Sequence, residues 1–596
     1  MRFTGSFICS VALLLPSAGM GQAPLQGRVM DSRTQEPLPY ASVVTVIDGK
    51  GVITNEEGIF RIPSVGEADT LAFSYLGYQP LRIAAAQVRA LDEVRMKPST
   101  TELSAVQVVG RNDALYDLVI ACGKHLRHGG RYAGKTYYQL ATRTMDLPVE
   151  QVECFYNGRY NGADIEALDL KQGRIGLLPV HGRYMVNLNT SRAFMLLHPA
   201  ERNSAFPATP LQYRSRKALH KAFDLTLVAT IHTPQELVQV SFTPKDTGGA
   251  FFSGKLWIET ATATVCSMEL ECDRCTRHPF LPMGPGDELR DLSIHYHQTF
   301  STWEGRPVVN TVALDYAYTY HTGTASARLA ERDPAFRNDW KFRTTGILHL
   351  FAPGESFILP FFRYDAGQMD YRKVLSMPYD SAFWANAPSL VQTDRQRQDE
   401  AMFAVEGLLL GNRQFDPTGR NRGGFFESNY AFWSPNSRVR MKSMLDSAAY
   451  APPQAHADGA TATASQLHLV AQLYLNVDRT PEGYRSFSAT VFDGFNSWCH
   501  LPDKQRSDLL LNIYFDLCEV ERRRMQAALD APGLSLERIR DIHAEAEKAM
   551  ERRMAAFLKD THYGADQQAM KRWNDLVRKE LGVDNFKIFG VADGAE

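Results

Sequence analysis

The stretch that decides the fold of the N-terminal part consists of residues 27–31 (GRVMD), 41–46 (ASVVTV) and 71–75 (LAFSY). In each of them apolar residues alternate with small or polar ones, which is typical of half-buried strands. Between the second and the third, residues 54–60 (TNEEGIF) predict a hairpin, because Gly58 can supply the positive φ that the chain needs to re-enter a strand. Short alternating strands with turn residues between them predict a small β-sandwich.

The same segment resembles the carboxypeptidase-regulatory-like domain, which has a transthyretin-like sandwich. The resemblance rests on residues 27–31, 36–39 (EPLP), 41–43 (ASV), 54–60 and 73–78 (FSYLGY). It covers about residues 26–98, and we place the sandwich domain at residues 24–98. The resemblance implies an accessory β-domain of Gram-negative cell-envelope proteins, including outer-membrane receptors. It implies no catalytic residues and therefore no peptidase.

Residues 1–23 have the three parts of a secretory signal peptide: Arg2, an apolar run over residues 7–16 and small residues over 17–21. We therefore expect export to the periplasm or association with the outer membrane. The apolar run is too short to cross ~30 Å of hydrocarbon, and no later stretch reaches the ~18 consecutive apolar residues of a membrane-spanning helix. The mature chain is expected to have no transmembrane span.

The 596 residues suggest three or four domains, because single domains usually hold about 100 to 200 residues. Hydrophobic residues make up 44% and charged residues 22%, which is typical of globular proteins. A net charge of -2 argues against nucleic-acid binding. After the sandwich we expect a connecting segment with a helix (99–131), an antiparallel β-rich domain (132–364), a mixed segment (365–449), a flexible linker (450–465) and a mainly helical domain (466–596).

The central domain contains alternating runs at residues 237–242 (LVQVSF), 254–259 (GKLWIE), 265–270 (VCSMEL) and 308–320. Residues 252–259 resemble the strand repeats of periplasmic lipoprotein-carrier-like half-barrels. A curved sheet of that kind could hold an acyl chain or a strand of a partner. Leu256 and Ile258 are expected to point to one face of the sheet and Trp257 to the other, and these three residues form a candidate ligand wall.

Two cysteines of the central domain have a spacing that suggests chemistry. Cys272 and Cys275 stand at the i, i+3 spacing of zinc ligands, and His278 follows them. His295 and His297 lie on one face of a predicted strand and could complete a site. Three interpretations remain open: a zinc site, a local or redox-active disulfide, and structural cysteines without a ligand. No metal site is assigned on this basis, and we expect no cofactor.

The C-terminal part shows helical periodicity. A stripe is formed by Leu510, Ile513, Leu517, Val520 and Met525. Ser535 can cap a second helix, and Gly582 can close the last one. The acidic residues Asp516, Glu519 and Glu521 adjoin Arg522, Arg523 and Arg524. We interpret this cluster as a solvated ion-pair face or an anchor for a neighbouring domain, rather than as a metal or acid–base site.

The sequence contains no nucleophile elbow, no zinc-protease motif, no P-loop and no dinucleotide fingerprint. Residues 371–384 and 512–523 are similar to segments of envelope proteins that carry the same N-terminal module, and this similarity brings no function with it. We predict a non-enzymatic envelope binding protein whose partner is an outer-membrane protein or an envelope ligand. The alternatives are a hydrolase or metal-dependent enzyme with its site in the central β-domain, and a periplasmic lipid or peptide carrier.

Overall fold

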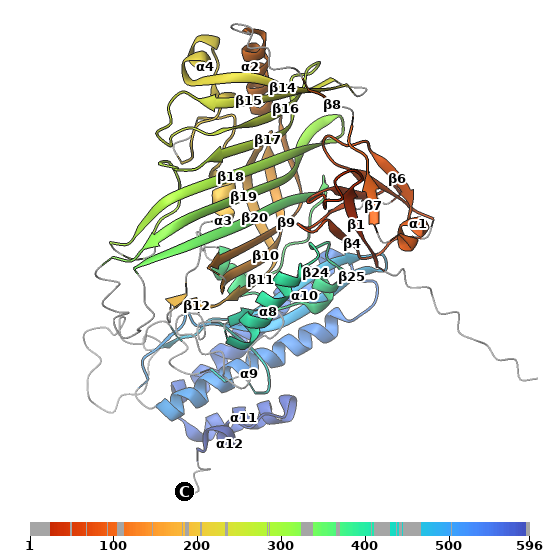
Figure 1. The fold of residues 1–596 in the computed structure, drawn as a ribbon. Helices are drawn as coiled ribbons and strands as arrows, with labels where there is room; N and C mark the ends of the chain where they lie inside the picture. The colour runs from red at the N-terminus through yellow and green to blue at the C-terminus, as the bar shows by residue number, and fades with distance from the viewer. Residues whose placement is uncertain are drawn as a thin grey trace, which may run out of the picture.

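A computed structural model describes residues 24–47, 51–66, 68–91, 93–99, 101–103, 113–145, 147–180, 183–184, 190–202, 205–232, 236–282, 284, 286–323, 338–364, 370–406, 408–410, 430–436, 438–439, 444, 467–501 and 504–591. The predicted signal peptide (1–23) and the predicted linker (450–465) lie outside these ranges. Figure 1 shows a small β-domain beside one large sheet, with a helical region at the C-terminal end. This arrangement confirms the predicted fold class: a multidomain chain, mainly β, with a C-terminal helical region.

The N-terminal domain is a sandwich of two small sheets. One sheet has the strand order β4-β1-β7, with β4 at Ile59–Ile62, β1 at Leu25–Asp31 and β7 at Glu93–Met96. The other has the order β3-β2-β5-β6, with β3 at Gly51–Ile53, β2 at Ser42–Thr45, β5 at Thr70–Ser74 and β6 at Leu81–Ala84, and helix α1 follows at Ala85–Ala90. Phe60 and Phe73 come from different sheets and meet edge to face, with ring centroids 5.6 Å apart. The two aromatic rings therefore join the sheets in one core.

The turn after β3 corrects the predicted hairpin. Strand β3 pairs with β2, whereas β4 pairs with β1, so the chain crosses from one sheet to the other between them. The local turn chemistry is as expected, because Gly58 has a φ of 73° and the Asn55 side-chain oxygen accepts hydrogen bonds from the Glu57 and Ile59 amides. Those local signals specify a reversal of the chain but not which strand each side then pairs with.

The large sheet has twelve strands, and every neighbouring pair is antiparallel. Its order is β21-β11-β10-β9-β20-β19-β18-β17-β16-β15-β14-β8. The bounds are β8 Thr101–Leu103, β9 Arg131–Thr144, β10 Leu147–Asn161, β11 Asp164–Leu177, β14 Phe223–His232, β15 Glu236–Pro244, β16 Ser253–Glu259, β17 Thr264–Cys272, β18 Glu288–Trp303, β19 Arg306–His321, β20 Asp339–Pro353 and β21 Leu408–Leu410. The two edge strands, β8 and β21, come from outside residues 132–364, so the sheet extends beyond that segment.

One face of this sheet, called the inner face below, is covered by short helices and irregular chain. The covering elements are α2 (Asp113–Arg127), α3 (Thr190–Leu196), a 3-10 turn at Pro210–Gln212 and α4 (Arg216–Ala222). Their apolar side chains, such as Val119 of α2 and Leu219 of α4, share one core with Leu256 and Ile294 of the sheet. Helix α2 lies within the connecting segment (99–131) for which the sequence predicts a helix.

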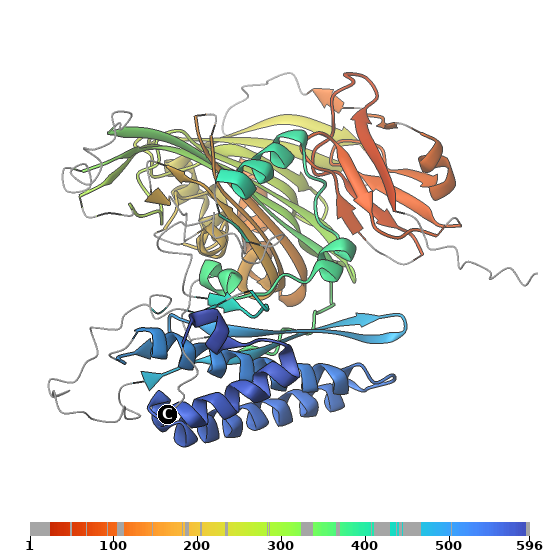
Figure 2. The same cartoon turned by 90° about the horizontal axis from the view of Figure 1, so that it is seen from below.

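The opposite face of the sheet is called the outer face below. Among the described residues, helices and the sandwich cover part of it. Phe383 and Trp384 of α7 (Ser381–Asn386) pack on Tyr137 and Phe155 of the sheet, together with Ile53 of the sandwich. Phe403 of α8 (Asp394–Glu406) lies beside Gly176 of β11 on this face, whereas Val374 of α6 (Asp370–Leu375) belongs to the core of the inner face. A two-stranded ribbon is formed by β12 (Pro179–Val180) and β13 (Arg183–Tyr184). Figure 2 shows the curvature of the sheet and the sandwich resting against its side.

The C-terminal region places helices on a small sheet. Its strands are β22 (Tyr430–Phe432), β24 (Ala471–Thr480) and β25 (Gly483–Asp493), with a short pair formed by β23 (Leu467–His468) and β26 (Trp498–Cys499). The helices are α9 (Lys504–Leu529), α10 (Leu536–Asp560), α11 (Gln567–Leu581) and α12 (Asn585–Phe589), with a 3-10 turn at His562–Gly564. The predicted caps are confirmed: Ser535 accepts from the Arg538 amide, and Gly582 ends α11 in a left-handed conformation. Figure 2 shows the β24–β25 hairpin lying between these helices and the large sheet.

Candidate functional site

The three residues of the candidate ligand wall lie on strand β16 and alternate between the two faces of the sheet. Leu256 and Ile258 are fully buried in the core of the inner face, with an exposed fraction of 0%. Trp257 lies on the outer face and is half-buried. Any group that reaches Trp257 from solvent must therefore approach the outer face, whereas Leu256 and Ile258 can be reached only by moving the covering elements.

The strand register places Trp257 in a row that crosses the outer face. It lies opposite Gln239 of β15 on one side and Ser267 of β17 on the other, and Ser267 lies opposite Thr299 of β18. Directly opposite residues of antiparallel strands share a face. Gln239, Trp257 and Thr299 are partly exposed, so this part of the row is accessible from solvent.

The next row on the same face carries charge. Lys255 lies opposite Glu269, and Glu269 lies opposite His297. The His297 ring shares a hydrogen bond of 2.9 Å with the Ser267 hydroxyl. Burial lowers the pKa of His297, while nearby Glu269 acts in the opposite direction. The row thus presents a cation, an anion and a mainly neutral imidazole beside Trp257.

The sandwich borders this part of the outer face. Ile53 of the sandwich packs against Ile347 of β20, and the Asn55 side-chain amide donates to the Val391 carbonyl at 3.0 Å. Asp315 of β19 lies near the sandwich, and burial raises the pKa of its carboxyl group to about 6. Glu56 of the sandwich also raises this pKa, whereas Arg343 lowers it. The sandwich therefore makes an apolar contact with the sheet and a polar contact with the segment between α7 and α8.

The residues of the proposed metal set are divided between the two faces. Cys272 lies opposite Ile294, which belongs to the inner core, while His295 and His297 pair with Glu271 and Glu269 on the outer face. Side chains on opposite faces of one sheet cannot meet at one ion. Within the described part of the chain, no three His, Cys, Asp or Glu side chains form a group that could hold a metal.

The remaining members of that set have other contacts. Cys272 and Cys275 are both buried; the Cys272 thiol donates to the Gly249 carbonyl at 3.8 Å, and the Cys275 thiol donates to the Cys272 carbonyl at 3.4 Å. His278 stacks on Phe280, and burial lowers the pKa of its imidazole. Its Nδ1 atom is buried without a hydrogen-bond partner. The structure therefore brings the two thiols together and leaves the histidine outside their contact.

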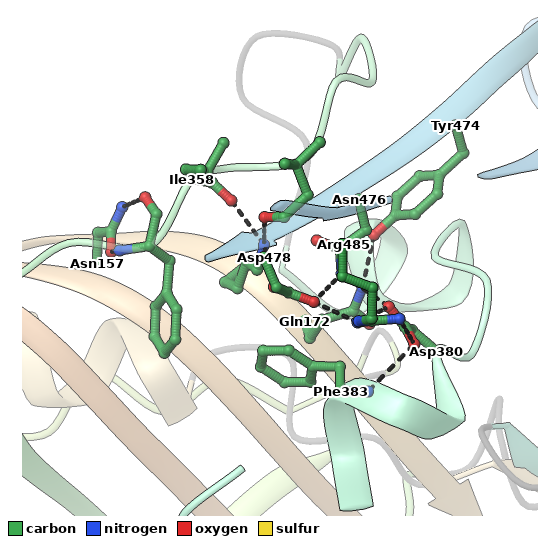
Figure 3. Close-up of polar contacts among 12 residues, drawn as sticks. Asn157, Gln172, Ile358, Asp380, Phe383, Tyr474, Asn476, Asp478 and Arg485 are labelled. Carbon is green, nitrogen blue, oxygen red and sulfur yellow. Dashed lines mark hydrogen bonds and ion pairs between the residues drawn. The ribbon is translucent and has the colours of Figure 1, made fainter. Parts of the chain in front are cut away.

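Sequence reasoning missed a buried charged network at the junction of the large sheet, α7 and the β24–β25 hairpin (Figure 3). Lys171 of β11 has an exposed side-chain fraction of 0% and pairs with Asp478 Oδ1 at 2.9 Å. Its Nζ also donates to the carbonyl oxygens of Ile358 at 2.7 Å and Val477 at 2.8 Å. Burial lowers the pKa of Lys171, and Asp478 counteracts that effect.

The second half of this network surrounds Asp380, which caps α7 by accepting from the Phe383 amide at 3.1 Å. Arg485 donates to both Asp380 oxygens, at 2.9 and 2.6 Å, and Asn476 donates to one of them at 2.9 Å. Two cations thus balance two carboxylates. A cap was foreseeable from the aspartate before α7, but its partners lie on a distant hairpin and left no local signal.

The structure decides between the two interpretations of the acidic cluster of α9. Asp516, Glu519 and Glu521 have exposed fractions of 0%, 2% and 5%, so they do not form a solvated face. Asp516 accepts a hydrogen bond of 2.6 Å from the Trp433 indole, and Glu519 accepts one of 2.8 Å from Thr490. The helix packs on the small sheet, and this packing removes the three carboxylates from water. Their contacts with β25 and with the segment after β22 make them anchors between elements.

Comparison with known families identifies one segment of the chain. Residues 25–108 match the model of the CarboxypepD_reg-like domain. The match includes the sandwich and extends a few residues past it, and it confirms the resemblance inferred from sequence. It covers a small part of the 596 residues, so it assigns a family to this domain only. No curated protein matches the chain.

Several solved structures align with part of the chain at low identity. The complex of MucA and MucB from Pseudomonas aeruginosa is 10% identical over 39% of this chain and 93% of that chain, with a TM-score of 0.14. A LolA superfamily protein from Nitrosomonas europaea is 7% identical over 40% and 93%, with a TM-score of 0.15. A DUF1329 family protein from Desulfovibrio piger is 9% identical over 43% and 94%, with a TM-score of 0.16. TM-scores this low support no conclusion about function.

Among the helices of the described residues, none combines the length and the apolar character needed to cross a membrane.

Proposed function

We propose that the chain is an exported, non-enzymatic binding protein of the bacterial envelope, and that a protein partner docks on the outer face of strands β15–β18. The partner is a protein of the periplasm or of the outer membrane. Export is supported by the signal-like residues 1–23, and an envelope role by the CarboxypepD_reg-like segment at residues 25–108.

The observation that carries this proposal is the position of Trp257. It is a large, half-buried aromatic side chain on a face whose neighbouring residues are polar, namely Gln239, Ser267 and Thr299. Tryptophan is enriched where proteins bind one another, because it combines a large apolar surface with one hydrogen-bond donor. Lys255 and Glu271 add exposed charges of both signs, which suit a polar rim around an aromatic anchor.

The buried charged groups support a structural role for themselves rather than a catalytic one. Lys171 is occupied by Asp478 and two carbonyl oxygens, and Asp380 by Arg485 and Asn476. A general acid or base must be within hydrogen-bond reach of a substrate, and these groups already bond to one another. We therefore interpret this charged network as an anchor between domains, which is compatible with a binding protein.

The experiment compares the variant Trp257→Ala with a matched control variant, Trp303→Ala. Each protein is used to capture partners from gently extracted envelopes, and native mass spectrometry measures what is captured. Trp303 is the last residue of β18, two strands away from Trp257 in the sheet, and stacks with Arg306. We expect Trp257→Ala to reduce capture by at least about tenfold, as for an interface anchor, with an unchanged melting temperature. Equal capture by both variants and the wild type would overturn the proposed docking face.

A lipid or peptide carrier is the second candidate, and the nature of the inner-face cover favours it. Leu256, Ile258 and Met268 form a continuous apolar floor. The cover of the inner face includes two helices of only seven residues, α4 beside β14 and α3 beside β11. Short elements are displaced more readily than long ones, so an acyl chain could enter beneath them.

Titration of the full chain with a fluorescent fatty acid tests this second candidate. Saturable binding that is weakened by Ile258→Ala and unaffected by Trp257→Ala would favour the carrier over the docking protein, because the two side chains face opposite sides of the sheet. No saturable binding would remove it.

A further inference from the structure

Cys272 and Cys275 are two thiols that the structure places close together in the core of the inner face, away from the proposed docking face. Cys272 is the last residue of β17, and Cys275 follows after two exposed residues, Asp273 and Arg274. Both side chains are buried in the inner core, and the Cys275 sulfur lies 3.4 Å from the Cys272 carbonyl oxygen.

We propose that Cys272 and Cys275 are a redox-active dithiol that closes to an intramolecular disulfide by exchange with a small-molecule disulfide. The turn between them allows the close approach of main chains that a disulfide needs, since residues i and i+3 of a tight turn lie within bridging distance. This modification site is independent of the docking face of Trp257.

The order of the exchange follows from the different surroundings of the two thiols. The Cys275 thiol donates to the Cys272 carbonyl oxygen at 3.4 Å, and the proximity of the two sulfurs lowers the pKa of Cys272 and raises that of Cys275. Cys272 is therefore the thiolate that attacks, because the thiolate is the nucleophile in exchange reactions. Its hydrogen-bond contacts otherwise extend to the Gly249 carbonyl, at 3.8 Å.

The proposed step balances as follows. The Cys272 thiolate attacks one sulfur of a disulfide RSSR, forms a mixed disulfide and expels RS⁻. Cys275 then gives up its proton and attacks the Cys272 sulfur, forming the intramolecular disulfide and expelling a second RS⁻. The two protein thiols are oxidised, RSSR is reduced to two thiols, and the two protons of the dithiol end on those thiols.

The other cysteines of the chain provide a contrast. Cys122, Cys154, Cys499 and Cys518 are buried, as Cys272 and Cys275 are, and Cys266 is half-buried, so the contrast lies in the pKa values of the thiols rather than in their exposure. Burial raises the pKa of Cys122 to about 12 and that of Cys266 to about 11, which keeps both protonated at neutral pH. These thiols are poor nucleophiles, so exchange should be selective for Cys272 and Cys275.

The bridge would affect the chain that covers the inner face. After Cys275, the Thr276 amide donates to the Gly249 carbonyl at 3.0 Å, and Phe280 then stacks on Tyr316 of the sheet with centroids 4.2 Å apart. Both rings belong to the inner core. A covalent bond at the start of this segment would restrict its opening, because it removes conformations from the open state.

Peptide mapping of the full chain tests the inference. After incubation with oxidised glutathione, removal of the reagent and alkylation, digestion by trypsin without reduction cuts after Arg274, between the two cysteines. We expect residues 256–274 to remain linked to residues 275–277, with fragmentation assigning the bond to Cys272. The Cys266→Ser variant should give the same link, whereas Cys272→Ser should not.

Two results would overturn the inference. Recovery of residues 275–277 as a free alkylated peptide from the oxidised wild type would show that no bridge forms, and this result needs no variant. A disulfide between Cys275 and Cys266 would show that Cys272 is not the partner of Cys275. Hydrogen exchange of residues 276–282 should slow on the order of tenfold on oxidation, and an unchanged rate would remove the proposed effect on the cover.

Discussion

Arg485 on the β24–β25 hairpin and Asp380 at the start of α7 form a two-pronged ion pair, with N–O distances of 2.9 and 2.6 Å. The Asp380 side chain is 2% exposed and that of Arg485 is 31% exposed. The pair joins the C-terminal hairpin to a helix that packs on the large sheet. It therefore offers a direct measure of how strongly the C-terminal region is anchored.

Removing the carboxylate should be costly. Asp380→Ala leaves Arg485 without this partner and the first turn of α7 without its cap, so we expect a loss of about 3–5 kcal/mol in the free energy of unfolding. Arg290→Ala is the matched control, because the pair of Arg290 with Glu288 is exposed and should be worth less than about 1 kcal/mol. Urea denaturation measures both changes. Equal midpoints for the two variants would contradict the anchoring role.

The sandwich core gives a second prediction. Phe60 and Phe73 have exposed fractions of 0% and 1%, and each fills space between the two small sheets. Phe60→Ala should lower the free energy of unfolding of the isolated domain, residues 26–98, by about 3–5 kcal/mol. For a domain of this size such a loss is most of its total free energy of unfolding. Circular dichroism during heating would reveal it, and an unaltered curve would place Phe60 outside the core.

The contact between sandwich and sheet should depend on pH through Asp315. Its folded-state pKa, about 6, lies above the ordinary value of 3.8 because of burial, so the folded protein holds the proton more tightly than the unfolded chain. Folded-state stability should therefore fall as pH rises from about 4 to 6, by on the order of 2–3 kcal/mol. Groups facing Asp315 are Arg343 and His295 on neighbouring strands and Glu56 on the sandwich.

Asp315→Asn tests this dependence, since it removes the charge and keeps the shape. The variant should be more stable than the wild type at pH 8 and nearly equal to it at pH 4. Melting temperatures at the two pH values make the comparison. If the difference in melting temperature between wild type and variant is the same at pH 4 and at pH 8, the Asp315 carboxylate does not titrate in this range.

Gly249 gives a prediction about the turn that holds the dithiol. Its φ is 80°, and a Cβ atom placed there would lie 1.9 Å from the Arg274 carbonyl oxygen. Gly249→Ala should therefore shift the Arg274 turn and cost more than about 1 kcal/mol. Gly286→Ala is the control, because it shares a φ of 81° but has open space around the added atom. Similar melting temperatures for both variants would indicate that the turn adapts freely.

The sandwich could be predicted from sequence because its signals are local. Residues 54–60 combine Asn55 and Gly58 within one turn, and the structure has both in the expected conformations. The alternation of Leu256, Trp257 and Ile258 likewise follows from the two-residue period of a strand. What those signals could not specify was the partner of each strand, and so the turn after β3 was interpreted as a hairpin.

The polar junction could not be predicted, since its members are far apart in the chain. Lys171 contacts Val477 across 306 residues, and no short motif links them. The β24–β25 hairpin lies in the segment predicted to be mainly helical (466–596), and Pro481 and Glu482 in its turn give no type I′ signal that would have indicated it. The buried state of Asp516 also required knowledge of what packs on α9.

The position of strand β9 has a consequence for how the protein is made. On one side β9 pairs with β10, its direct successor, but on the other Tyr138 pairs with Leu348 of β20. During synthesis β9 and β10 can form a hairpin at once, while the second edge of β9 must wait for residues that leave the ribosome much later. An unpaired strand edge can associate with other chains, and non-local pairing of this kind is slow. Chaperone demand and aggregation should therefore peak just before β20 is synthesised, and truncated chains ending before Asp339 should be the least soluble.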